Sequence, residues 1–330
     1  MNNKKIFSLM IAIGLFCAVF VWQGVEPVIA KLGAAGWSIL AVCIFAVPVI
    51  IGNSEAWRIL FLNKPRPSFI DTINASWIGT SVNYILPVAT IGGELVKARI
   101  LTLWGTPALD TISTMVVDKT VQAIAAAVMG LFGVAVFAWL LPNDQRIFSI
   151  TIMTLALAAG IAGFIALQIY GGFSVVARIV DSLVSSDRFK AFMTTASELD
   201  AAIRQIYARP GPFIWSIVIR VATQLSIVGE LLLAAYLLGE PIDFVEAVAI
   251  KVLVGVARDA AFAVPGQLGV QEAAYVGMGA IFGYSADLML AISLAARLRE
   301  LLPSIPMIFA WQIIEARHLK SQTMNSAEVS

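Results

Sequence analysis

The residues of this chain best able to do chemistry are charged and polar side chains that interrupt long apolar stretches. Such a charge costs a few kcal/mol at the centre of a bilayer, so it faces the protein interior or a water-filled cavity. We predict that these side chains bind a polar or anionic ligand; pairing with one another is the structural alternative. The candidate binding residues are Asn83, Glu94, Lys97, Arg99, Asp118, Lys119, Arg258, Asp259, Glu272 and Arg297. Further charges that could pair within apolar stretches are Glu55, Arg58, Glu230, Lys251, Arg299 and Glu300.

Composition excludes several kinds of site. His318 is the only histidine, and Cys17 and Cys43 lie within apolar stretches. The sequence therefore has no HExxH motif, no Ser/His/Asp triad and no disulfide framework. We predict no catalytic residue, no metal ion and no cofactor. The net charge of +1 gives no basic excess of the kind that binds nucleic acid.

Two stretches 178 residues apart share a pattern of helix breakers, a lone glutamate and a later glycine. Glu94 and Gly105 belong to the first stretch, and Glu272 and Gly283 to the second. The breakers before the glutamates are Pro87, Gly92, Gly93, Pro265, Gly266 and Gly269. In a membrane protein, a pair of Gly/Pro-interrupted segments at matching places in two halves points to a substrate site.

Each glutamate follows a break at which a half-helix is expected to begin. Glu94 and Glu272 could cap free N–H groups there, or could balance the charge of an anion bound by those groups. Lys97 is spaced to pair with Glu94, which leaves Arg99 on another helix face. Asn83 could bind the ligand or could satisfy backbone groups freed by the break.

The elements that must position these residues are membrane helices. Hydrophobic residues make up 59% of the 330 residues and charged residues 13%, and the mean hydropathy is +0.88. We predict an all-α, polytopic membrane protein with about eight spans and two interrupted or re-entrant segments, about 88–105 and 266–283. The expected spans are about 6–25, 36–61, 69–86, 111–141, 147–170, 211–239, 242–264 and 286–313.

Charge around the spans predicts their orientation. Lys4 and Lys5 precede an apolar run that we interpret as an uncleaved first span; a signal peptide is the alternative. Lys and Arg gather in alternate loops, which places both termini in the cytoplasm. The unit 69–141 then runs opposite to the unit 242–313, as in the inverted repeats of many secondary transporters.

Residues 1–320 are expected to form one transmembrane domain, with residues 321–330 as a disordered tail. Apolar residues recur at helical spacing within 174–209. That spacing predicts an amphipathic helix on the cytoplasmic membrane surface, or else a solvated connector.

The motifs resemble the membrane region of lysylphosphatidylglycerol synthases and related flippase-like proteins. The resemblance rests on SVNYILPVATIGGELVKARIL, on Val117-Asp118-Lys119 and on PGQLGVQE, and it covers about residues 36–315. AWRIL and VVDKTVQ are most similar to the hopanoid-biosynthesis-associated subgroup. The resemblance implies lipid handling in the bacterial inner membrane. It argues against aminoacyl-lipid synthesis, because the sequence ends near residue 330 without a soluble transfer domain.

The expected function is movement or presentation of an anionic or hopanoid-type lipid between leaflets, with a membrane lipid as partner. An ion- or proton-coupled transporter of a small solute would share the inverted repeat. A scaffold for lipid-biosynthesis enzymes would use the segment 174–209 for docking. A membrane-embedded lipid transferase would need acid–base carboxylates, such as Asp118 with Glu94 or Asp259.

Overall fold

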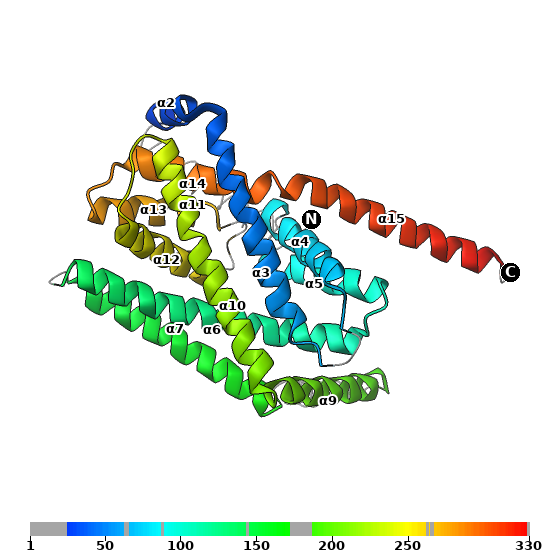
Figure 1. Ribbon diagram of the computed structural model, residues 1–330. Coiled ribbons are helices and arrows are strands. Elements are labelled where there is room, and N and C mark those ends of the chain that lie inside the picture. The colour runs from blue at the N-terminus through cyan, green and yellow to red at the C-terminus, as the bar shows by residue number, and fades with distance from the viewer. Residues whose placement is uncertain are drawn as a thin grey trace.

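Apolar sequence between short polar turns folds into helices throughout the described chain (Figure 1). The computed structural model describes residues 25–62, 66–86, 89–142, 145–171, 187–261, 264 and 267–328. No strand occurs within these ranges, so the predicted all-α class is confirmed. The elements are α2 (Val25–Ala35), η1 (Gly36–Phe45), α3 (Ala46–Arg58), α4 (Phe69–Ile85), α5 (Ala89–Leu103), α6 (Ala108–Leu140), α7 (Arg146–Ile169), α9 (Asp187–Tyr207), α10 (Pro210–Ser226), α11 (Val228–Leu237), α12 (Phe244–Ala260), α13 (Val270–Ile281), α14 (Ala286–Leu301) and α15 (Ser304–Glu328).

Four helices of the described chain are long and apolar enough to cross a membrane: Ile29–Arg58, Ala108–Leu140, Phe148–Ile169 and Pro210–Leu237. Large apolar side chains on their outer surfaces are exposed, among them Trp139 on α6, Phe148 on α7 and Trp215 on α10. A soluble protein rarely leaves so many such groups in water. The protein is embedded in a membrane, with these side chains toward lipid.

Helix boundaries agree with the sequence for most of the chain and differ at both ends. The predicted span 36–61 belongs to a longer helical stretch that begins at Val25 and includes the 3-10 segment η1. The predicted span 286–313 is divided after Leu301. The expected first span, 6–25, lies almost wholly outside the described residues.

Proline explains the division near the C-terminus. Pro303 has no N–H to donate to the helix, so the backbone bonds of α14 stop there. The next helix, α15, continues to Glu328, and it projects from the remaining helices (Figure 1). Residues 321–328, predicted as a disordered tail, are therefore helical.

The amphipathic segment forms α9, whose apolar face packs on protein. Ile203 and Ile206 are buried in a cluster with Leu60 of the α3–α4 connection and with Val117 and Val121 of α6. The predicted helix is thus present, with buried side chains in contact with α6, and its place on the cytoplasmic membrane surface stays a prediction. Residues 172–186 of the predicted segment lie outside the described part.

The two units with matching breakers have the same succession of elements. In each, a 17-residue helix is followed by a break, a short helix, a tight turn and another helix: α4, α5 and α6 in one, and α12, α13 and α14 in the other. The short helices α5 and α13 have 15 and 12 residues, fewer than the roughly 20 needed to cross a bilayer. In Figure 1, α6 runs from right to left and α14 from left to right.

The tight turns of the two units have the same backbone geometry. Gly105 and Gly283 have φ of +94° and +81°, a region that favours glycine. The N–H of Thr106 donates to the carbonyl of Leu101 at 3.0 Å, and that of Tyr284 donates to Gly279 at 2.9 Å. Both are Schellman caps, and the next helix begins three residues after each glycine.

The second turn is also fixed by a side chain. The Tyr284 hydroxyl donates a hydrogen bond to the Glu246 carboxylate at the start of α12. Burial and this bond raise the pKa of Tyr284 to about 12, so the hydroxyl keeps the proton that it donates.

Candidate functional site

Close contact between α4 and α5 positions the first group of charges. A Cβ on Gly93 would lie 2.0 Å from the carbonyl oxygen of Gly79, so neither helix could approach as closely with a larger residue there. Asn83 Oδ1 accepts the Gly93 N–H at 2.8 Å. This hydrogen bond fixes α5, which carries Glu94 and Lys97, against α4.

The first group, here called the first network, joins α5, α6, α10 and α3. Lys97 Nζ lies 3.1 Å from both Glu94 Oε2 and Asp118 Oδ2. Lys119 Nζ lies 2.8 Å from Glu94 Oε1. Arg220 of α10 contacts Asp118 Oδ1 and also donates to Asn53 Oδ1 at 3.0 Å. Among the ionic groups in contact here, three cations meet two carboxylates.

Trp57 closes one side of the first network. The Lys97 ammonium lies 4.0 Å from the centroid of the Trp57 ring, a cation–π contact in a desolvated setting. Trp57 Nε1 in turn donates to Thr114 Oγ1 at 3.2 Å. Lys97 is thus enclosed by an aromatic face and two carboxylates.

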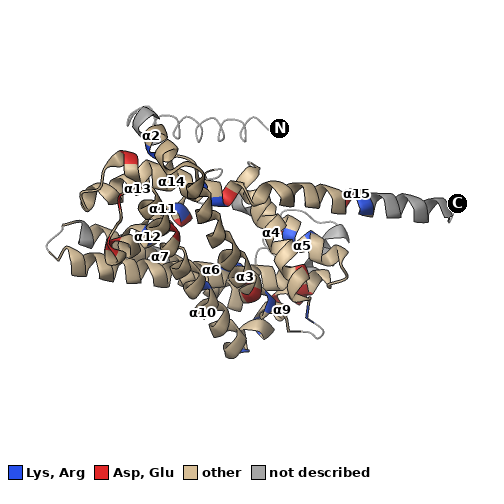
Figure 2. Cartoon of the chain, turned by 45° about the horizontal axis from the view of Figure 1, so that its top comes forward, with Lys and Arg blue, Asp and Glu red and all other residues tan. Residues whose placement is uncertain are grey.

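The second group, the second network, joins α11, α12, α13 and α14, where red and blue positions adjoin in Figure 2. Glu230 contacts Lys251 at 3.0 Å and Arg299 at 2.8 Å. Its remaining ion pairs are Arg258–Glu300 at 2.8 Å, Arg297–Glu272 at 3.1 Å, Arg297–Glu300 at 3.3 Å and Arg299–Glu300 at 3.4 Å. Here four cations meet three carboxylates.

The two networks contain the same triad at matching positions. In the first, Lys119 contacts Glu94 and donates to Gln122 Oε1 at 2.9 Å. In the second, Arg297 contacts Glu272 and Glu300. Every member of one triad lies 178 positions from its counterpart, so both repeats place a glutamate of the short helix against a cation of the following helix.

A model of one protein family matches almost the whole chain. It describes the lysylphosphatidylglycerol synthase TM region and covers residues 6–306. The chain belongs to this family. No curated protein matches the chain as a relative. The family relates the chain to lipid handling in a membrane, as the resemblance in the motifs implied.

Within this member of the family, most of the predicted residues come together. Glu94, Lys97, Asp118 and Lys119 form the first network, and Arg258, Glu272 and Arg297 belong to the second. The predicted pairing of Lys97 with Glu94 is present. The helix breakers Pro87, Pro265 and Gly266 lie outside the described residues.

The start of the short helix before Glu94 differs from the sequence-based expectation. The helix α5 begins at Ala89, so Gly92 and Gly93 lie inside it and Glu94 is too far along to cap its start. Glu272 does act as a cap, because its Oε2 accepts the Gly269 N–H at 2.8 Å.

Arg99 lies apart from both networks. It is exposed and contacts Glu315 of α15 at 2.6 Å, so it stands on a different helix face from Lys97, as its spacing indicated. Asp259 is exposed next to the networks and interacts electrostatically with Arg258 and Lys119.

Arg220 and the neutral hydrogen-bond partners of the networks are not among the residues predicted from the sequence. Arg220 lies within the predicted span 211–239, so it is a charge inside an apolar stretch, just as the predicted binding residues are. Tyr275 accepts from Lys251 at 2.8 Å, and Gln267 accepts from Arg258 at 2.9 Å. Neutral residues of these types are common in helices, and only the fold shows that they meet a charge.

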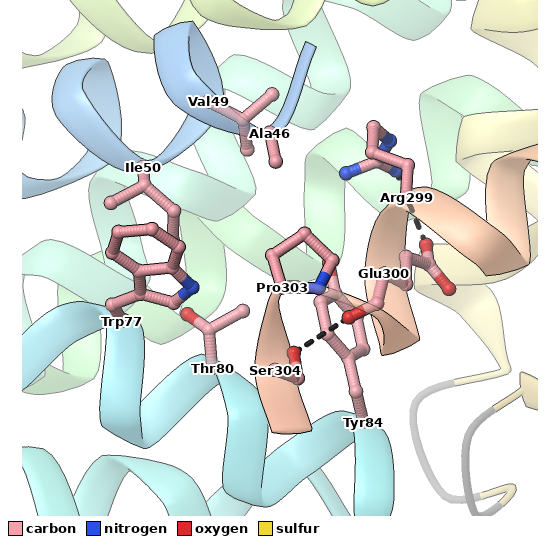
Figure 3. Close-up of a pocket in the computed structure, with 10 residues that line it drawn as sticks. All are labelled: Ala46, Val49, Ile50, Trp77, Thr80, Tyr84, Arg299, Glu300, Pro303 and Ser304. Atoms are coloured by element: carbon pink, nitrogen blue, oxygen red, sulfur yellow. Dashed lines mark hydrogen bonds and ion pairs between the residues drawn. The ribbon is translucent and has the colours of Figure 1, made fainter. Parts of the chain in front are cut away.

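A small cavity adjoins the second network. It is lined by Trp77, Thr80 and Tyr84 of α4, by Arg299 and Glu300, by α3 and by the α14–α15 junction (Figure 3). The volume of about 20 Å³ is enough for one water molecule, since one water needs about 10–15 Å³. The cavity therefore extends the polar interior from the second repeat toward α4 of the first.

The arrangement is suited to holding an anion. The two networks together contain seven cations and five carboxylates, and Asp259 raises the carboxylates to six. No group of His, Cys, Asp and Glu among the described residues could hold a metal ion. The surplus positive charge, in an otherwise apolar body, is electrostatically favourable for a negative headgroup.

Proposed function

We propose that this protein moves or presents an anionic lipid between the leaflets of the bacterial inner membrane. The supporting observation is the repeated triad: Glu94–Lys119–Gln122 in one repeat and Glu272–Arg297–Glu300 in the other. Matching polar sites on two repeats with opposite orientation are the usual construction of a midplane substrate site. Family membership supports lipid as the substrate class.

The headgroup would lie between the two networks while the acyl or polycyclic tail stays in lipid. Transfer of a charged headgroup through hydrocarbon is slow because the charge loses its hydration. Cations and hydrogen-bonding side chains along the path would replace part of that hydration. A hopanoid-type lipid is the finer expectation from the motifs.

We also propose an orientation of the chain in the membrane. Both termini would face the cytoplasm, and the two repeats would cross the bilayer in opposite directions. Enzymes of lipid biosynthesis are the proposed partners, since a translocated lipid must be supplied on one side.

Transfer of a labelled lipid in proteoliposomes tests the function. The purified full chain is reconstituted in phosphatidylethanolamine vesicles that contain a trace of phosphatidylglycerol with a fluorescent headgroup-proximal label. An impermeant quencher then reports the label left in the inner leaflet. We expect transfer well above that of protein-free vesicles, and an equal rate in the two preparations would contradict the proposal.

The same vesicles distinguish the rival functions. An ion- or proton-coupled solute transporter would leave lipid transfer at the protein-free rate and would respond to an imposed pH or ion gradient by taking up solute. A lipid transferase would convert the labelled lipid to a product of different mobility in thin-layer chromatography.

A further inference from the structure

The two equivalent triads are not equally enclosed. The Lys119 side chain is 36% exposed, whereas that of Arg297 is 10% exposed. The carboxylates follow the same order, at 15% for Glu94 and 0% for Glu272. One copy of the triad is thus open to an arriving ligand and the other is not.

The contacts of the second triad are all structural. Arg297 uses Nε on Glu272, Nη1 on Glu300 and Nη2 on the carbonyl oxygen of Gln267. Glu272 also accepts from Ser293 at 3.3 Å and caps α13 through the Gly269 N–H. Removing either member leaves buried groups without partners, so this triad acts as a fixed clamp between α13 and α14.

The first triad is held more loosely. Lys119 Nζ contacts Glu94 Oε1 at 2.8 Å and donates to Gln122 Oε1 at 2.9 Å, and an ammonium has three protons to donate. Glu94 Oε2 is buried with no hydrogen bond, although the Lys97 ammonium lies 3.1 Å away. Glu94 can therefore stay paired with Lys97 when it leaves Lys119.

The exchange determines the charge that a ligand meets. With Glu94 withdrawn to Lys97, which lies 3.1 Å from Glu94 Oε2, Lys119 offers one unbalanced positive charge. That charge suits an anionic group.

We propose that the Lys119 ammonium binds the phosphodiester of a lipid headgroup in exchange for Glu94. This rests on the proposed function for its lipid substrate. The exchange is an ion-pair replacement: Lys119 passes from Glu94 to the phosphate, and Glu94 stays paired with Lys97. No covalent bond changes.

Lipid retention in detergent tests the site without any transport. The purified full chain is incubated with phosphatidylglycerol, phosphatidic acid, phosphatidylethanolamine or inorganic phosphate, and the bound fraction is measured by native mass spectrometry. Lys119→Gln should lower phosphatidylglycerol retention about tenfold, because a charge-assisted hydrogen bond is lost. Glu94→Gln should raise it several-fold, since the competing carboxylate is gone.

Arg58→Gln is the matched control, since Arg58 pairs with Glu55 outside both networks; it should leave retention unchanged. If Lys119→Gln does not fold, the charge-balanced double variant Glu94→Gln/Lys119→Gln should fold and still lose phosphatidylglycerol. Retention that Glu94→Gln leaves unchanged or lowers would overturn the exchange. Inorganic phosphate bound as well as lipid would overturn the lipid assignment.

The two proposals fail separately. Wild-type protein that retains phosphatidylglycerol but does not transfer it in vesicles would leave the Lys119 site standing and contradict the transport function. Lipid transfer by Lys119→Gln at the wild-type rate would agree with the transport function and contradict the Lys119 site.

Discussion

Asp118 shows how a single buried charge holds several helices together. It lies on α6, is 2% exposed, and receives Lys97 from α5 and Arg220 from α10. Both cations are buried. The ion pairs of Asp118 therefore link the first repeat to a helix outside it.

We expect Asp118→Asn to lower the free energy of unfolding by about 3–5 kcal/mol, because two buried cations lose their shared carboxylate. The measurement is thermal unfolding in detergent, followed by intrinsic tryptophan fluorescence. Glu315→Gln is the control, since Glu315 pairs with the exposed Arg99, and exposed pairs contribute little. Similar losses of stability in both variants would contradict a structural role specific to Asp118.

At residue level, the sequence identified most charges of the networks and the pairing of Lys97 with Glu94, but not the partners that lie on other helices. The cost of a charge in hydrocarbon singles out Glu94, Lys97 and Lys119 from composition alone. It does not show that Arg99, two positions from Lys97, points toward α15 instead. Which charges meet depends on the crossing of helices far apart in the chain, and no local pattern encodes it.

At the level of elements, glycine determines how closely α4 and α5 pack. A Cβ on Gly79 would lie 2.6 Å from the Gly93 carbonyl oxygen and 2.8 Å from Lys97 Cβ. Backbone atoms cannot move aside as a flexible side chain can. Glu94 and Lys97 therefore keep their positions because Gly79 of α4 and Gly93 of α5 have no side chains.

Gly93→Ala should separate α4 from α5 and break the bond from Gly93 N–H to Asn83. We expect a marked loss of thermal stability together with weakened phosphatidylglycerol retention. Gly277→Ala is the matched control: its Cβ would meet nothing within 4 Å, and alanine is favoured over glycine in a helix by about 1 kcal/mol. A Gly93→Ala protein as stable as Gly277→Ala would show that the close approach is not needed.

The elements themselves could largely be predicted from the sequence. Apolar length and breakers place α4, α6 and α7 within a few residues of their observed bounds, and the predicted span 211–239 matches the helical stretch Pro210–Leu237 that α10 and α11 form together. The α14–α15 division and the packing of α9 on α6 could not be predicted, because apolar periodicity does not distinguish a face that meets lipid from one that meets protein.

At the scale of the whole molecule, the repeat predicts how the chain is oriented in the membrane, and labelling can test this orientation. Residues 107 and 285 occupy equivalent, exposed positions beside the two Schellman turns. If the repeats are inverted, these turns lie on opposite sides of the membrane.

The test uses a chain in which Cys17 and Cys43 are replaced by serine, with Pro107→Cys or Ser285→Cys added. An impermeant thiol reagent applied outside right-side-out cells or spheroplasts should label one variant, and applied to inside-out vesicles it should label the other. Labelling of both variants from the same side would contradict the inverted arrangement.

The paired left-handed glycines of the two turns also limit which substitutions the chain tolerates. Gly105 and Gly283 have positive φ, and a Cβ at either position would meet nothing within 4 Å. The backbone conformation, and not a lack of space, therefore favours glycine at both positions.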